Sequence, residues 1–511
     1  MRRSPWFMLF LALACQGELF DYTLPGTKPG SGQPPTPFTP ALALRIGGTG
    51  SDLVAGLVVD PDGGMILAGT FIGSADFDPG PEAGALTSLG GADGFIARYT
   101  PNGSLVWARR FGGDRDERVS ALARDAAGNI YLGGGFEGST AFEFAGIGLV
   151  LNSLGGEDGF VAKFSPGGSL LWARRFGGGG SDRVAALAVS PAGNAYAGGS
   201  FEGLASAFPA GGVAIVSNGS SDGFLLALGA DGSVAATLPI GGPEADAVLG
   251  VAISAGGNPV AAGTFRGASD FARNGGVPGS LTALGGSDVF LARYSPAGLL
   301  LEIEAIGGLN DESVVPGGLT LDGQGGPVLI GGFSGSVDFD PGPGTAVRTR
   351  VGGGSGGQDL FLARYDDAGG FLSVATIGGL GAIAAASVIA DPDGSALVTG
   401  AFSGPVDFDP GPGLRVLTSY GTRGATDAFA ARYTAAGLLA WVGQFGSGTA
   451  AAEDANAGTG LGLDPAGNVI VTGRFFGTPD FDPGNTAFRL TSLGAADGFL
   501  VKLTSSGSLA P

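Results

Sequence analysis

One unit of about 65 residues is repeated seven times along the chain, and this repeat constrains the fold more than any other feature. An apolar residue followed by Gly-Gly marks six units, and Phe445-Gly446-Ser447 marks the seventh. The pairs begin at Gly47, Gly112, Gly177, Gly241, Gly307 and Gly378. A fixed period of this length is typical of architectures in which each unit buries its core against its neighbours.

A second marker, Asp-x-Phe, recurs with the same count and a similar period. Its acids are Asp93, Asp158, Asp222, Asp288, Asp359, Asp427 and Asp497. An active site seldom needs seven equivalent copies, so we interpret each acid as a cap that accepts backbone N–H bonds in a Gly-rich turn. We expect the phenylalanine two residues later to fill the core between units. The alternative interpretation is a ring of functional carboxylates.

Each unit contains short strand-like runs separated by turn residues. In the second unit these runs are Val119–Arg124, Ile130–Gly133, Phe160–Phe164 and Leu170–Arg175. Long apolar stretches with helical periodicity are absent, which favours strands over helices. Four antiparallel strands repeated radially form a propeller blade. The sequence therefore predicts an all-β fold, a seven-bladed β-propeller of four-stranded antiparallel blades, with the Gly-Gly pairs as corners.

The two ends of the repeat region predict how the ring closes. The last unit stops after Phe499–Leu503 and a turn, and it lacks a fourth strand. Residues Ala41–Ile46, before the first Gly-Gly, form an unpaired fourth-strand segment, which we expect to pair into the last blade and remove its open edge. The uncharged segment Phe371–Ala390 has the length of a membrane span, but its repeat register predicts two strands and a corner.

The predicted domains are a signal peptide (1–14), a Pro/Gly-rich tether (15–40) and the propeller (41–511). Its units span about 49–113, 114–178, 179–242, 243–308, 309–379, 380–447, and 448–511 with 41–48. The N-terminal segment has Arg2 and Arg3 before a short apolar stretch, as in a secretory signal.

The sequence Leu11-Ala-Leu-Ala-Cys15 resembles the lipobox of bacterial lipoproteins, although that family prefers leucine three residues before the cysteine. The resemblance implies lipidation of Cys15, and Gln16 implies sorting to the outer membrane or cell surface. An ordinary cleavage site before Cys15 is the alternative. The tether composition predicts an extended, semi-stiff spacer.

The combined motifs resemble the bacterial SBBP (seven-bladed beta-propeller) repeat. They are Phe-x-Ala-Arg/Lys-Tyr, a Gly turn, Trp-Ala, Gly-Gly, Asp-x-x-Gly-Asn and Tyr-x-x-Gly, and they cover about residues 41–504. Only Trp107, Trp172 and Trp441 mark the tryptophan position, and Ala227 replaces the basic residue of the third unit. The resemblance implies the fold and an extracytoplasmic location, and it implies no activity.

A third motif, Asp-Phe-Asp-Pro-Gly, occurs in the first, fifth, sixth and seventh units, which are contiguous in a closed ring. Its acids are Asp76, Asp78, Asp338, Asp340, Asp407, Asp409, Asp480 and Asp482. Two carboxylates on a tight turn are hard oxygen ligands that suit Ca²⁺, with weak affinity because the motif lacks the further acids of an EF-hand loop. The alternative is a Pro-Gly turn with a packed phenylalanine and solvated acids.

Composition excludes several classes of protein. The chain has no histidine, which rules out Ser-His-Asp catalysis and imidazole metal sites. The single Cys15 allows no internal disulfide and no cysteine zinc cluster. The net charge of −20 disfavours nucleic acid as a partner. The basic residues that follow the Asp-x-Phe acids, at Arg98, Lys163, Arg293, Arg364, Arg432 and Lys502, are expected to be solvated or paired at blade edges.

The sequence thus predicts a monomeric, lipid-anchored propeller at the cell surface that acts as a non-enzymatic binding or scaffolding module. Its partner would be a surface protein or a polysaccharide. One alternative is a Ca²⁺-dependent adhesion or polysaccharide-binding protein that uses the acidic loops. The second is a carbohydrate-active enzyme with carboxylates in the central channel.

Overall fold

The computed structural model describes residues 41–510, apart from 79–83, 145–146, 208–212, 274, 353–356, 421–423, 448–454 and 485–486. Throughout this range the regular elements are β-strands, without a helix, so the predicted all-β class is confirmed. The described residues accordingly include no helix long and apolar enough to cross a bilayer. The predicted signal peptide, Cys15 and the tether lie outside the described residues.

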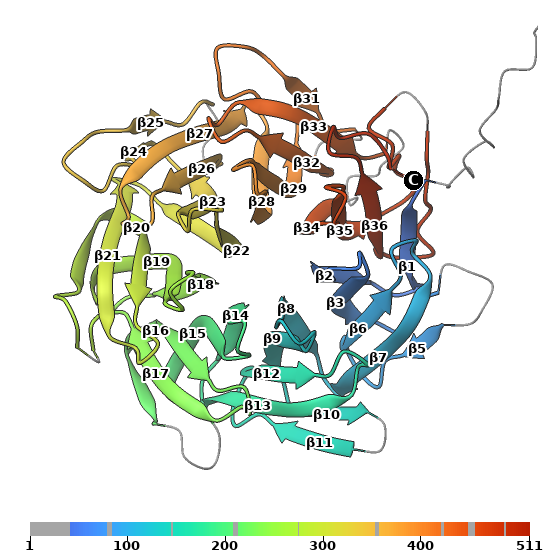
Figure 1. The fold of residues 1–511 in the computed structure, drawn as a ribbon, viewed down its shortest axis with the longest axis horizontal. Coiled ribbons are helices and arrows are strands. Elements are labelled where there is room, and N and C mark those ends of the chain that lie inside the picture. The colour runs from blue at the N-terminus through green and yellow to red at the C-terminus, as the bar shows by residue number, and fades with distance from the viewer. Residues whose placement is uncertain are drawn as a thin grey trace, which may run out of the picture. The chain divides into compact units, whose positions relative to one another are not determined.

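Strand groups of the same design are arranged around a common centre (Figure 1). In the first unit, β2 (Leu53–Val59), β3 (Met65–Phe71), β6 (Asp93–Tyr99) and β7 (Leu105–Gly113) pair in that order, all antiparallel. The next groups are β8 (Glu117–Arg124), β9 (Ile130–Phe136), β12 (Asp158–Phe164) and β13 (Leu170–Gly178); β14 (Arg183–Val189), β15 (Ala195–Ala207), β16 (Ile215–Leu228) and β17 (Val234–Ile240); and β18 (Ala247–Ile253), β19 (Pro259–Asp270), β20 (Ser280–Tyr294) and β21 (Leu300–Gly308).

The remaining groups follow the same order from the inside outward. They are β22 (Glu312–Leu321), β23 (Pro327–Phe333), β26 (Asp359–Tyr365) and β27 (Phe371–Gly379); β28 (Ala382–Ala390), β29 (Ala396–Ser403), β32 (Asp427–Tyr433) and β33 (Leu439–Phe445); and β34 (Ala457–Leu463), β35 (Val469–Phe475) and β36 (Asp497–Leu503), with β1 (Ala43–Gly48) as the outer strand. The uncharged segment Phe371–Ala390 forms β27 and β28, which confirms the prediction of two strands.

Both ends of the repeat region meet in the last group. Strand β1 pairs antiparallel with β36, so that Ala43 lies opposite Val501 and Ile46 lies opposite Gly498. The predicted pairing of the N-terminal strand with the last unit is therefore confirmed. The inner strands β2, β8, β14, β18, β22, β28 and β34 contact one another in chain order, and β34 in turn contacts β2.

The hydrogen-bonded sheets differ from the separate four-stranded sheets that the sequence predicted. Within the described residues, the strands form six sheets of four to eight strands, because outer segments join neighbouring groups. The added hairpins are β4 (Ser74–Asp76) with β5 (Ala85–Thr87), β10 (Ser139–Phe144) with β11 (Ile147–Asn152), β24 (Ser336–Asp338) with β25 (Val347–Thr349), and β30 (Pro405–Asp407) with β31 (Val416–Thr418).

The Gly-Gly pairs lie where neighbouring strand groups are joined. The prediction that they form corners is therefore wrong. Gly47 and Gly48 end the outer strand β1 and pair with Asp76 and Ala75 of the hairpin β4–β5 in the first unit. A Cβ atom on Gly48 would lie 1.9 Å from the carbonyl oxygen of Ser74. The second glycine of the pair is needed because a neighbouring backbone approaches it closely.

Candidate functional site

The Asp-x-Phe acids are all buried, and five of them begin the third strand of their group, whereas Asp222 and Asp288 lie inside the longer strands β16 and β20. The carboxylate of Asp93 accepts the backbone N–H of Leu89 at 3.1 Å and pairs with Arg110 at 2.7 Å. The other six carboxylates each accept a backbone N–H from a residue four to eight positions earlier in the chain, from Leu154, Asn218, Leu284, Val351, Tyr420 and Leu493. Each acid therefore stabilises the backbone of the segment that precedes it.

The first glycine of each pair leaves room for these carboxylates. A Cβ atom on Gly112 would lie 2.4 Å from Cγ of Asp93. The equivalent Cβ on Gly307, Gly378 or Gly446 would lie 2.2 Å from Cγ of the Asp-x-Phe acid of its own unit. The two sequence markers therefore recur together because a buried carboxylate occupies the space beside the glycine.

A second set of buried acids was missed by the sequence analysis. Four residues after the second glycine stand Asp52, Glu117, Asp182, Asp246 and Glu312. The carboxylate of Asp52 accepts the N–H of Gly48 at 2.7 Å, and the other four repeat this bond. Their constant distance from Gly-Gly was the available signal, although the residue alternates between Asp and Glu and is Ile383 in the sixth unit.

These acids lie beside the Asp-x-Phe acids and are protonated more readily than free carboxyl groups. Burial raises the pKa of Asp52 to about 6, with a further contribution from the charge of Asp497. Burial and the nearby Asp93 raise the pKa of Glu117 to about 8. A buried carboxyl group that faces a second carboxylate favours its neutral form. Each of these repeats therefore holds a pair of interacting carboxyl groups inside the protein.

The acids of the Asp-Phe-Asp-Pro-Gly motif organise the loop that follows the first hairpin strand. Oδ1 of Asp338 accepts the N–H groups of Asp340 at 3.1 Å and Ala346 at 2.8 Å. Oδ1 of Asp340 accepts the N–H of Gly342 at 2.8 Å. The bond from the second acid to the first is repeated in the other three loops, at Asp76 with Asp78, Asp407 with Asp409, and Asp480 with Asp482.

Each of these loops is anchored by its phenylalanine, and the loops lie on separate units. The ring of Phe77 is buried 4.7 Å from the ring of Phe95, the phenylalanine of Asp-x-Phe in the same unit. Phe339 and Phe361 repeat the contact at 5.1 Å. Within the described residues, no group of three or more acidic or cysteine side chains is placed to hold a metal ion. A cation at one of these loops would need carbonyl or water oxygens to complete its shell.

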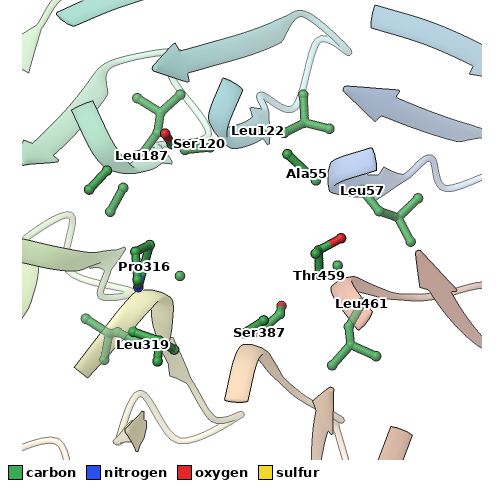
Figure 2. A pocket seen from close by; sticks show the side chains of 18 of the residues that line it. Ala55, Leu57, Ser120, Leu122, Leu187, Pro316, Leu319, Ser387, Thr459 and Leu461 are labelled. Carbon is green, nitrogen blue, oxygen red and sulfur yellow. The ribbon is translucent and has the colours of Figure 1, made fainter. Parts of the chain in front are cut away.

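A pocket of about 460 Å³ lies where the inner strands meet (Figure 2). Its wall is apolar apart from the hydroxyl groups of Ser120, Ser387 and Thr459. The wall includes side chains such as Leu57, Leu122, Leu187, Leu319 and Leu461. Among the described residues that line the pocket there is no acid or base. The described wall of this pocket thus shows none of the carboxylates that the enzyme alternative expects in the central channel, and the repeated acids are buried within and between the strand groups.

Comparisons with known proteins are distant. No protein-family model matches the chain. An uncharacterized WD repeat-containing protein of Acanthamoeba polyphaga mimivirus is 25% identical over 126 residues, which are 23% of this chain and 9% of that protein. The match thus spans less than a tenth of the curated relative's own length.

Several solved structures align with most of this chain at low similarity. The U3-55K structure is 11% identical with a TM-score of 0.41, and covers 90% of this chain and 98% of its own. The structure of the RRP9 WD40 repeats is 11% identical with a TM-score of 0.39, and the match covers 90% of this chain and 100% of that chain. A puromycin hydrolase is 13% identical with a TM-score of 0.32, and the match covers 84% of this chain and 59% of that chain. The strand pairing of this chain itself, rather than these similarities, defines its architecture.

Proposed function

We propose that the chain is a seven-bladed β-propeller of the SBBP-repeat type, in which each strand group forms one four-stranded blade. The contact between β34 and β2 and the pairing of β1 with β36 support a closed ring. The glycine pairs support it further, since Gly446 bridges to Asp480 and Gly241 bridges to Asp270 as Gly47 pairs with Asp76. Closure of this kind protects every sheet edge.

We propose that the propeller is a non-enzymatic binding or scaffolding module. The observation that carries this proposal is the central pocket, whose described lining is apolar and holds no titratable side chain. Such a wall offers no general acid, general base or charged nucleophile, whereas it can bury apolar surface. The chemistry that fits the pocket is an apolar side chain or a short apolar segment of a partner protein.

The proposal is tested with an apolar fluorescent probe, N-phenyl-1-naphthylamine, whose emission rises when it leaves water. We expect saturable binding by the wild-type chain and loss of binding in Ser387→Trp, which fills the pocket from β28. The matched control is Ser104→Trp, which places the same ring on an exposed turn. Equal binding by both variants, or none by the wild type, would refute the central pocket as a binding site.

The location of the module is a separate proposal. We infer that Cys15 is lipidated and that the tether holds the propeller at the outer membrane or cell surface. The lone cysteine at the end of a short apolar segment supports this inference. Mass spectrometry of the mature N-terminus tests it, and an unmodified Cys15 would contradict the anchor.

Calcium-dependent adhesion or polysaccharide binding is the second candidate function. It rests on the four Asp-Phe-Asp-Pro-Gly loops, whose units are neighbours if the ring closes through β1. The second acids Asp340 and Asp409 each accept a backbone N–H through Oδ1. Any Ca²⁺ bound there would have to be held with few protein ligands and hence weakly.

A further inference from the structure

One basic side chain breaks the pattern of its repeat. At the equivalent position of the third strand, five of the six basic residues form an ion pair. These are Arg98 with Asp60 (2.6 Å), Lys163 with Asp125 (3.6 Å), Arg293 with Asp367 (2.9 Å), Arg432 with Asp391 (2.6 Å) and Lys502 with Asp464 (2.8 Å). The sixth, Arg364 in β26, makes no hydrogen bond or ion pair with another described residue.

Arg364 is nevertheless buried. Its exposed fraction is 5%, and its Nε and Nη2 atoms have no hydrogen-bond partner. Burial lowers the pKa of this guanidinium, although Asp322 and Asp393 oppose the shift from a distance. A buried cation without a partner is costly, because it has lost its hydration and gained no ion pair in return. Among the six basic residues at this position of the repeat, only Arg364 is buried without an ion-pair partner.

The two nearest acids are engaged elsewhere. Oδ1 of Asp322 accepts the N–H groups of Gln324 and Gly326, each at 2.9 Å. Oδ2 of Asp393 accepts a hydrogen bond from Arg432 at 2.8 Å. Asp322 stands in the turn between β22 and β23, as Asp60 does between β2 and β3. The acid of the repeat is thus present, but it does not pair with Arg364.

Arg364 forms part of the wall of a hollow of about 430 Å³ between the fifth and sixth strand groups. Three turns contribute to the hollow: Asp322–Gln324, Pro392–Gly394 and Ala435–Ala436. Leu372 and Ser373 of β27 complete the wall, and Leu372 is 57% exposed. The hollow combines one unpaired cation with an apolar contact surface and the polar side chains of Gln324 and Ser373.

We propose that this hollow binds a small hydroxylated carboxylate, the chemistry of a uronic acid residue. A guanidinium presents parallel N–H donors that match the two oxygens of a carboxylate. Gln324 and Ser373 offer hydrogen bonds to hydroxyl groups, and Leu372 offers an apolar surface to the carbon skeleton. The acids Asp322 and Asp393 at the wall favour a single negative charge over a dianion such as phosphate. This site is independent of the central pocket.

The test is isothermal titration calorimetry of the mature full-length chain with D-glucuronate, D-glucose and inorganic phosphate. We expect saturable binding of glucuronate, with glucose and phosphate at least tenfold weaker. Arg364→Gln should weaken glucuronate binding at least tenfold. Arg98→Gln changes the same repeat position in the first unit, where the arginine is paired, and should bind as the wild type does.

Further measurements on two variants separate the loss of binding from the loss of folding. Arg364→Met keeps the volume and removes the unpaired charge, so without ligand it should melt at or above the wild-type temperature. Glucuronate should raise the melting temperature of the wild type but not of this variant. Ser373→Trp should block binding while Arg364 is intact. Glucuronate binding that survives in Arg364→Met, or phosphate binding as tight as glucuronate binding, would overturn the proposal.

Discussion

Arg45 and Asp497 form an ion pair at 3.1 Å although 452 positions separate them in the chain. Asp497 is fully buried, and Arg45 is its charged partner from the strand that completes the last group. The pair therefore couples the pairing of β1 with β36 to the neutralisation of a buried charge. Removal of one member of such a pair leaves the other charge uncompensated.

We predict that Arg45→Gln lowers the free energy of unfolding by about 3 kcal/mol, the usual cost of leaving a buried charge without its partner. Urea denaturation followed by circular dichroism measures the change. The control is Arg415→Gln, which replaces an exposed arginine of the β30–β31 hairpin and should change stability by less than about 0.5 kcal/mol. Equal stability of the two variants would show that the ion pair contributes nothing to the pairing of β1 with β36.

The glycine pairs give a second prediction. Gly112→Ala should lower the free energy of unfolding by about 2 kcal/mol, because its Cβ would lie 2.4 Å from Cγ of the buried Asp93. Gly179→Ala is the matched control, since a Cβ there meets no atom within 4 Å and the new side chain restricts only the unfolded chain. Thermal unfolding of both variants is the measurement. A Gly112→Ala variant as stable as Gly179→Ala would be inconsistent with the close packing of glycine and carboxylate.

Repetition made the fold predictable from the sequence, because strand-like runs and turns recur at matched positions. The terminal segment Ala41–Ile46 could be assigned to the last unit because that unit lacked one strand. The role of Gly-Gly was not predictable, since the backbone that approaches Gly48 belongs to Ser74 on a hairpin of the next unit. The unpaired state of Arg364 also escaped the sequence, because Asp322 occupies the usual position of the pairing acid and the sequence does not show that it bonds to backbone N–H groups instead.

The buried carboxyl pairs predict an unusual dependence of stability on pH. Burial raises the pKa of Glu117 to about 8, whereas a glutamate in an unfolded chain titrates near 4.5. Between these values the folded protein holds a proton that the unfolded chain has released. Stability is therefore full below the unfolded pKa and falls as pH rises through the folded pKa.

We accordingly expect the melting temperature to fall between pH 5 and pH 8. The free energy of unfolding should fall over this range by up to about 1.4 kcal/mol per pH unit for each bound proton. Glu117→Gln mimics the protonated group, so it should remove the share of one proton from this slope and stabilise the protein at pH 8, while the other buried acids keep the rest of the slope. The control Glu137→Gln changes a glutamate whose side chain is half exposed, and should leave the slope unaltered. A stability that rises from pH 5 to pH 8 in the wild type would contradict the raised pKa values.

The acidic loops give the last prediction, because their two interpretations differ in the response to calcium. If the loops bind Ca²⁺, thermal unfolding of the full-length chain should shift upward from EDTA to several millimolar calcium. The free energy of unfolding should rise by about 2.7 kcal/mol when calcium reaches a hundred times its Kd.

The triple variant Asp340→Asn, Asp409→Asn, Asp482→Asn should lose the shift. It should still fold, because an asparagine Oδ1 can accept the backbone N–H that Asp340 and Asp409 accept now. Magnesium at the same concentration is the ionic-strength control. An unchanged melting temperature with calcium would mean that these carboxylates only shape turns, with Phe339 and its equivalents as the anchors.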